Sequence, residues 1–223
     1  MFPLYDIEKA PKFPFVTIGI ILVTAFAFFL ELTVSDPDGF IAQFALIPSH
    51  VNFGNLISLI PFITAIFLHG GFLHIISNLW FLWIFGDNVE AYLGRLQYIF
   101  LYFTAGIAGN FLQYILMPAS DIPMLGASGA IAGVLGAYFI LFPRHRVKTI
   151  VPFGFLFVTE VPAVVMLGYW FVLQIFSGVA SLPAASGTGG VAFLAHIGGF
   201  IVGMILAKTL KPAYKEPNQV WES

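Results

Sequence analysis

The amino-acid sequence predicts an all-α fold: a polytopic membrane protein built as a bundle of six transmembrane helices. Its low content of charged residues and the length of its apolar segments carry this prediction. Hydrophobic residues make up 59% of the 223 residues and charged residues only 9%, whereas soluble domains carry about 25% charged residues. So few charges cannot cover the surface of a soluble domain, and we therefore expect the chain to lie in a lipid bilayer.

Composition also excludes several kinds of chemistry. The chain has no cysteine, which excludes disulfides, thiolate catalysis and cysteine-ligated metals. Its formal net charge of −2 gives no indication of nucleic-acid binding. The N-terminus lacks the layout of a signal peptide: the first apolar run is too long for a signal h-region and has no small-residue cleavage site. We interpret this run as a retained transmembrane helix.

Six apolar segments are long enough to cross a bilayer, which takes about 17–25 residues. The predicted spans are Phe13–Leu32, Phe67–Phe85, Leu96–Met117, Met124–Phe142, Val161–Val179 and Val191–Leu210. Pro48, Gly54 and Pro61 interrupt the long first connection, so we expect a loop in the membrane interface there and not a seventh span. The predicted organisation is a cytoplasmic segment 1–12, a membrane domain 13–210 and a cytoplasmic tail 211–223.

The basic residues predict the orientation of these spans. With six spans, all nine fall on one side of the membrane: Lys9, Lys12, Arg95, Arg144, Arg146, Lys148, Lys208, Lys211 and Lys215. The opposite loops carry Asp36, Asp38 and Asp121. Since Lys and Arg accumulate in cytoplasmic loops, both termini are expected in the cytoplasm. Five or seven spans would scatter these charges over both faces.

Polar residues lie at similar depths in three predicted spans that all run from outside to inside. The second span carries His69, His74 and Asn78, the fourth Ser128 and the sixth His196. At 1.5 Å per residue, Ser128, His196 and His74 lie roughly 6, 7–8 and 10 Å below the outer ends of their spans. His74 and Asn78 are four residues apart, which places both on one helix face.

The cost of burying polar groups predicts that these side chains converge. A buried hydroxyl, amide or imidazole without a partner costs roughly 2–7 kcal/mol, so the groups should face each other or water inside the bundle. Two stripes of small residues at four-residue spacing allow close helix contact: Gly129, Gly133 and Ala137 in the fourth span, and Ala195, Gly199, Gly203 and Ala207 in the sixth. If these stripes face each other, Ser128 and His196 can meet.

A serine beside a histidine predicts nucleophilic catalysis. The imidazole can take the hydroxyl proton during attack and return a proton to the leaving group. Unpaired backbone N–H groups where the helix begins, near Ser128, could stabilise the resulting oxyanion, and His74 and Asn78 could add side-chain donors. Gly126 and Gly129 leave room for a substrate backbone. The arrangement has no acidic third member.

These segments resemble those of the rhomboid family of intramembrane serine proteases. The similar segments are "HGGFLHIISN" (residues 69–78), "GDNVEAYLGR" (86–95), "GASG" (126–129) and "AHIGGFIVG" (195–203), in register over nearly the whole chain. The resemblance implies that Ser128 is the nucleophile, that His196 is the base, that His74 and Asn78 help to form the oxyanion hole, and that His69 is structural.

The resemblance also implies the reaction and its setting. The expected reaction is hydrolysis of peptide bonds in or beside a transmembrane helix, with no cofactor and no metal. The expected partners are single-span or polytopic membrane-protein substrates and the lipid bilayer, with no nucleic acid. The absence of further spans suits the minimal prokaryotic form, and therefore a prokaryotic plasma membrane. Substrate is expected to enter beside the fifth span, near Tyr169, Trp170 and Phe171, below a cap formed by the loop 180–190.

The chain departs from the family pattern at two places. Many members carry a Trp-Arg pair in the first long loop, and this chain has none. Some members place an aromatic residue one turn after the serine, beneath the catalytic histidine. Here that residue is Ala132, so another group must hold the His196 ring.

Other interpretations explain fewer of these features. A catalytically silent relative should have lost Ser128 or His196, and both are present. A small transporter or channel would be expected to show inverted repeats, and none is evident. A metal site formed by His69, His74 and His196 would lack a carboxylate at the same depth. The glycine stripes and single polar residues are also compatible with helix packing alone.

Overall fold

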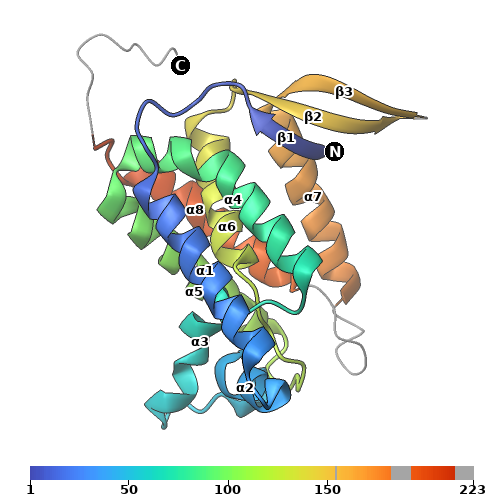
Figure 1. Cartoon of the computed structure of the whole chain (residues 1–223). Helices are drawn as coiled ribbons and strands as arrows, with labels where there is room; N and C mark the ends of the chain where they lie inside the picture. The colour runs from blue at the N-terminus through green and yellow to red at the C-terminus, as the bar shows by residue number, and fades with distance from the viewer. Residues whose placement is uncertain (154, 182–191, 214–223) are drawn as a thin grey trace.

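In a computed structural model, which describes residues 1–153, 155–181 and 192–213, six long helices follow one another in the predicted order (Figure 1). They are α1 (Phe15–Thr33), α4 (Phe72–Leu93), α5 (Arg95–Leu116), α6 (Ser128–Leu141), α7 (Ala163–Ser181) and α8 (Phe193–Thr209). Several of them are apolar over a membrane-spanning length, as expected of a polytopic membrane protein.

The described helices differ in how well they meet the requirements of a membrane span. By length and composition, α1, α5 and α7 are each sufficient. The stretch Leu56–Phe67 and α4 meet the requirements together but are bent by 78°. The apolar helices α6 and α8 are shorter, with 14 and 17 residues. The count of six spans therefore stays a prediction.

The predicted start of the fourth span is wrong by four residues, because α6 begins at Ser128 and not at Met124. The backbone before Ser128 is bonded elsewhere: Met124 forms an isolated antiparallel bridge with Leu46, and the Gly126 N–H donates to the Ala65 carbonyl at 2.9 Å. Gly126 also has φ +128°, which side chains rarely allow. Ser128 is therefore the first residue of the helix.

The second span was also predicted with wrong ends. Helix α4 begins five residues later than expected and continues beyond Phe85 to Leu93, so most of the segment 86–95 is helix and the turn is made by Gly94 at φ 76°. Glu90, which is buried in the last turn of α4, has its partners in another helix. Its carboxylate accepts the N–H groups of Val16 and Thr17 at 2.9 and 2.8 Å, and it thereby caps the first turn of α1.

The long first connection contains no long helix, as predicted. It consists of short pieces: α2 (Pro37–Phe44), η1 (Pro48–His50), η2 (Leu56–Leu59), α3 (Pro61–Thr64) and η3 (Ala65–Phe67). These pieces lie at the end of the bundle opposite the N-terminus (Figure 1). The Glu31 carboxylate of α1 accepts the His69 N–H at 3.0 and 3.2 Å, and this bond fixes the end of the connection beside α4.

A three-stranded antiparallel sheet at the other end of the bundle was not predicted (Figure 1). It consists of β1 (Phe2–Asp6), β2 (Arg146–Phe153) and β3 (Phe155–Pro162). The N-terminal segment is thus the first strand of this sheet, and the connection from α6 to α7 supplies the other two. The alternating pattern around Val147 and Thr149, both fully buried, is typical of a strand.

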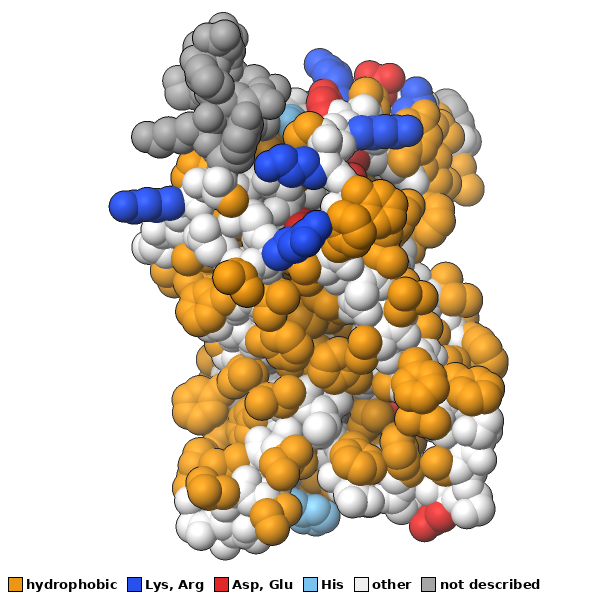
Figure 2. Space-filling view, turned by 60° about the vertical axis from the view of Figure 1, so that its left-hand side comes forward, with side chains coloured by type: hydrophobic (Ala, Val, Ile, Leu, Met, Phe, Trp, Pro, Cys, Tyr) orange, Lys and Arg blue, Asp and Glu red, His pale blue; other side chains and the backbone are white. Residues whose placement is uncertain are grey.

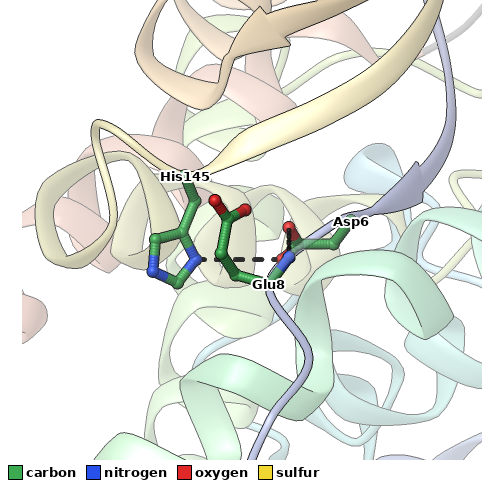
Figure 3. Close-up of side chains that lie close together, drawn as sticks. All are labelled: Asp6, Glu8 and His145. Carbon is green, nitrogen blue, oxygen red and sulfur yellow. Dashed lines mark hydrogen bonds and ion pairs between the residues drawn. The ribbon is translucent and has the colours of Figure 1, made fainter.

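The strand β1 is anchored to the bundle by a polar cluster at Asp6. The Asp6 side chain, in a residue only 8% exposed, accepts hydrogen bonds from Asn88 Nδ2 at 2.8 Å and from the Tyr138 hydroxyl. Figure 3 shows Glu8 and His145 beside it, with His145 Nδ1 4.0 Å from Asp6 Oδ2. Burial raises the pKa of Asp6 to about 7 and lowers the pKa of His145.

Charged and apolar side chains occupy different parts of the molecular surface. In Figure 2 the Lys and Arg side chains gather at one end of the molecule, and apolar side chains cover most of the remaining surface of that face. The N-terminal segment, the turn at Gly94 and the segment that follows α6 all lie at the end of the bundle that carries the sheet (Figure 1). This arrangement agrees with the predicted grouping of the basic residues.

Helix α6 forms the centre of the bundle, and all residues from Gly129 to Tyr138 are buried. The two predicted glycine stripes face each other. A Cβ atom placed on Gly199 would lie 2.0 Å from the Gly129 carbonyl oxygen, and one on Gly203 would lie 1.9 Å from the Gly133 oxygen. The backbones of α6 and α8 are therefore as close as glycine permits, which confirms the predicted contact.

We predict that Gly199→Ala destabilises the bundle. The added methyl group meets a backbone oxygen that cannot rotate away, so the helices must separate; overpacking of this kind costs about 1–3 kcal/mol. Thermal unfolding in detergent should show a lower midpoint than in the wild type. Gly19→Ala is the matched control, because a Cβ there would meet nothing within 4 Å. Equal midpoints for the two variants would contradict the close α6–α8 contact.

The Asp6 cluster predicts a pH-dependent difference between the wild type and Asp6→Asn. Because the fold raises the Asp6 pKa from 3.8 to about 7, it favours the protonated carboxyl. The stabilising contribution is complete below about pH 4 and is lost as the pH rises through 7. Wild-type stability should thus fall by about 1–3 kcal/mol relative to Asp6→Asn.

Thermal midpoints of both proteins between pH 4.5 and 8.5 measure this difference. Both proteins are also measured with His145→Gln, because His145 Nδ1 lies 4.0 Å from Asp6 Oδ2 and its titration therefore depends on Asp6. A difference that is constant with pH would show that Asp6 is not held in a desolvated site.

Candidate active site

The predicted site residues lie near the first turns of three helices. His74 is the third residue of α4, Ser128 the first of α6 and His196 the fourth of α8. Helix α6 packs against both α4 and α8, and all three helices begin toward the end of the bundle opposite the sheet (Figure 1). The depth predicted from residue counts therefore corresponds to the first turn or two of each helix.

Ser128 and His196 are placed by neighbouring residues in direct contact. A Cβ atom on Gly129 would lie 3.5 Å from the Ala195 carbonyl oxygen and 3.8 Å from the Ala195 Cβ. His196 is 7% exposed, and its Nε2 atom is buried without a hydrogen-bond partner among the described residues. No hydrogen bond between Ser128 and His196 is present in the part of the chain that is described. The site therefore contains a free imidazole nitrogen.

The His196 ring is held by α7. Its Nδ1 atom lies 2.8 Å from Gln174 Oε1, and the Trp170 ring stacks on it with centroids 5.9 Å apart and an interplanar angle of 28°. Because an amide oxygen only accepts, Nδ1 carries the proton and Nε2 keeps its lone pair. These two side chains hold the His196 ring from α7, because Ala132 of α6 has no ring that could pack beneath it.

Gln174 was not singled out from the sequence. A signal was present, because Gln174 is an uncharged polar residue in the middle of an apolar span, between Leu173 and Ile175. A polar side chain at such a position requires a partner inside the bundle. The sequence does not show which side chain that partner is, so the contact with His196 emerges only from the structure.

His74 is oriented with its Nε2 atom toward Gly126. Its Nδ1 atom accepts the Gly70 N–H at 3.4 Å, so Nε2 carries the ring proton and can donate. A Cβ atom on Gly126 would lie 2.8 Å from His74 Nε2 and 3.6 Å from Ser128 Oγ. The imidazole donor and the serine hydroxyl therefore both lie close to Gly126, where a side chain would collide with the His74 ring.

Asn78 and His69 complete the polar groups of α4 and of the segment before it. Asn78 is 7% exposed, and its Nδ2 atom has no partner among the described residues. It follows His74 by one turn on the same face. His69 lies with its ring centroid 5.0 Å from that of His74, and its Nδ1 atom is 3.2 Å from the Phe67 carbonyl oxygen. His69 therefore packs behind His74.

Backbone donors are also available where α6 begins. The first hydrogen bond of this helix runs from the Ile131 N–H to the Ala127 carbonyl at 2.9 Å. The N–H groups of Ser128, Gly129 and Ala130 consequently have no acceptor within the helix. Together with the helix dipole, these groups make the beginning of α6 favourable for negative charge.

A cluster that could reach a metal ion lies at the sheet end of the bundle, away from these residues. The ligand atoms of Asp6, Glu8 and His145 lie within 4.8 Å of one another (Figure 3). Asp6 already accepts hydrogen bonds from Asn88 and Tyr138, and Glu8 Oε2 accepts the Arg146 N–H at 2.8 Å. The cluster is explained by the anchoring of the N-terminal strand.

Comparison with known sequences identifies the family. The family model of the Rhomboid domain matches residues 57–213. Rhomboid protein 1, mitochondrial, from Saccharomyces cerevisiae is 31% identical over 166 residues, which cover 73% of this chain and 45% of that protein. The presenilin-associated rhomboid-like protein, mitochondrial, of Mus musculus is 35% identical over 92 residues, or 40% of this chain and 24% of that protein.

A bacterial relative, the rhomboid homologue YdcA of Bacillus subtilis, is 38% identical over 79 residues, which cover 35% of this chain and 39% of that protein. The chain belongs to the rhomboid family and is a polytopic membrane protein. The matched region spans less than half the length of each of these three relatives.

Proposed function

We propose that the protein is an intramembrane serine endopeptidase that hydrolyses peptide bonds in or beside the transmembrane helix of membrane-protein substrates. One observation carries the proposal: the buried Nε2 atom of His196 has no partner among the described residues, and its helix packs directly against the helix that begins at Ser128. An unsatisfied basic nitrogen is costly in such a setting, and a Ser-His dyad gives it a use. Membership of the rhomboid family supports this proposal.

The proposed reaction proceeds in two steps. His196 Nε2 takes the Ser128 proton while Oγ attacks the scissile carbonyl carbon, and the protonated imidazole then donates to the leaving amine as the C–N bond breaks. Water attacks the resulting acyl-enzyme with His196 as the base, which releases the acid product and restores the serine. In both steps His196 must accept a proton at Nε2, so its own proton must lie on Nδ1. The contact with Gln174 favours this tautomer.

The proposed oxyanion donors are His74 Nε2–H, Asn78 Nδ2–H and a backbone N–H at the start of α6. Two of these groups come from one face of α4, and the Asn78 amide nitrogen lacks a partner in the part of the chain that the structure describes. Donors that are already oriented toward developing negative charge stabilise the transition state more than the bound substrate. The removal of one such donor from a serine protease costs about 2.7–4 kcal/mol.

The proposed depth of the site follows from the length of α6. Its 14 residues rise about 21 Å, less than the hydrocarbon core of about 30 Å. If α6 ends near the basic, cytoplasmic surface, Ser128 lies below the opposite surface. Water would then reach it from outside and substrate from the side, past α7. The proposed cap 180–190 lies mostly outside the described residues.

We place the protein in a prokaryotic plasma membrane with both termini in the cytoplasm. The gathering of Lys and Arg at one end of the molecule supports this orientation (Figure 2). The names of the yeast and mouse relatives assign those proteins to mitochondria, and another relative is bacterial. The charge distribution therefore supports the orientation, and the bacterial relative supports the choice of membrane.

We predict that Ser128→Ala and His196→Ala each abolish cleavage of a single-span substrate, with a loss of at least about a thousandfold. A fluorophosphonate probe should label the wild type and not Ser128→Ala. Both variants should keep the thermal midpoint of the wild type to within a few degrees, because each loses only one side chain. Ser35→Ala, which alters an exposed serine just after α1, is the control and should keep full activity.

If the Ser128→Ala variant is labelled by the probe or still cleaves the substrate, Ser128 is not the nucleophile. A folded wild type that neither cleaves nor is labelled would instead favour a catalytically silent member of the family.

A further inference from the structure

We propose that Gln174 of α7 is a positioning residue that fixes the reactive tautomer of His196, so that the base is competent only while α7 is packed against α8. This inference rests on the proposed function and concerns how that same site is controlled. It begins from the 2.8 Å contact between Gln174 Oε1 and His196 Nδ1. The contact joins α7, the helix beside which substrate is expected to enter, to the predicted catalytic base.

The contact determines which ring nitrogen can act. A neutral imidazole carries one proton, and its position is set by the partner of the other nitrogen. Gln174 Oε1 accepts from Nδ1–H and leaves the lone pair on Nε2, the atom that has no partner among the described residues. Without this acceptor the proton can move to Nε2, and His196 then cannot take a proton from Ser128 through that atom.

The plane of the ring is fixed by the same helix. Trp170 stacks on His196 at 28°, and it precedes Gln174 by four residues, so both side chains lie on one face of α7. Helix α6 contributes Ala132 one turn after Ser128, which offers no ring for stacking. Within the described residues, α7 therefore supplies both the acceptor for Nδ1 and the stacking partner of the ring.

Helix α7 is also the spanning helix with the fewest buried residues. Of the three helices that meet the span requirements alone, it has 22% of its apolar window buried, compared with 28% for α1 and 39% for α5. Its contacts with the rest of the bundle are mainly with α8 and α6. If α7 moves outward to admit a substrate helix, Gln174 and Trp170 leave His196 together. The base is then restored only when α7 closes again.

The test compares Gln174→Leu with Gln174→Glu in the full-length protein. Leucine removes the acceptor at similar volume, whereas glutamate keeps an oxygen in the same place. We expect Gln174→Leu to lower kcat about 10- to 100-fold, because small errors in the placement of a catalytic group cost up to about a hundredfold. KM for a transmembrane substrate should change less than about twofold, and Gln174→Glu should recover most of kcat.

Two further measurements separate positioning from packing. Nitrogen-15 NMR of His196 should show a single Nδ1–H tautomer in the wild type and Gln174→Glu, and a mixture in Gln174→Leu. Ile175→Ala changes the neighbouring, exposed side chain of α7 and should leave kcat and the tautomer unchanged.

An unchanged kcat in Gln174→Leu, or an effect on KM alone, would overturn the inference while wild-type cleavage still supports the proposed function. If the wild type does not cleave at all, the proposed function fails. The NMR spectra then still test the contact, because a mixed tautomer in the wild type would overturn it. If Gln174→Leu does not fold, the wild-type and Gln174→Glu spectra provide the same test.

Discussion

The close approach of α6 and α8 is the constraint on which the rest of the structure depends. Glycine at positions 199 and 203 of α8 lets the backbone oxygens of Gly129 and Gly133 in α6 occupy the space that Cβ atoms would fill. Ser128 and His196 flank one helix contact, because Ala195, the residue before His196, packs against Gly129, the residue after Ser128. Helices held apart by ordinary side chains would leave the two residues farther apart, so the packing surface and the candidate site are parts of one arrangement.

Buried polar groups in this chain fall into two classes. The carboxylates of Glu31 and Glu90 accept backbone N–H groups of His69 and of α1, and they hold the ends of elements in place. Asn78 Nδ2 and His196 Nε2 are equally buried but have no partner among the described residues. Thr24, His69, Tyr102 and Gln113 also hold buried polar atoms without such a partner, so the candidate site is distinguished by the gathering of these groups near the start of α6 and not by their occurrence alone.

Sequence periodicity and composition predicted the order of the six long helices, the facing glycine stripes and the absence of a long helix in the first connection. They failed where backbone bonding or a distant partner decides the structure. The start of α6 depends on bonds to Leu46 and Ala65, and the Glu90 carboxylate near the end of α4 has its partners in α1. Strand β1 pairs with distant residues of β2, such as Asp6 with Val147, whereas the β2–β3 hairpin was missed although its residues are close in sequence. Gln174 was missed because its partner belongs to another helix.

The central claim is that Ser128 attacks and that the oxygen which gains negative charge faces α4. The structure of a covalent adduct with a phosphonate inhibitor tests it most directly. The account predicts a bond from Ser128 Oγ to phosphorus, with the phosphonyl oxygen within hydrogen-bonding distance of His74 Nε2 and Asn78 Nδ2 and with Gln174 still on His196 Nδ1. An adduct on another residue, or a phosphonyl oxygen directed away from α4, would contradict the account.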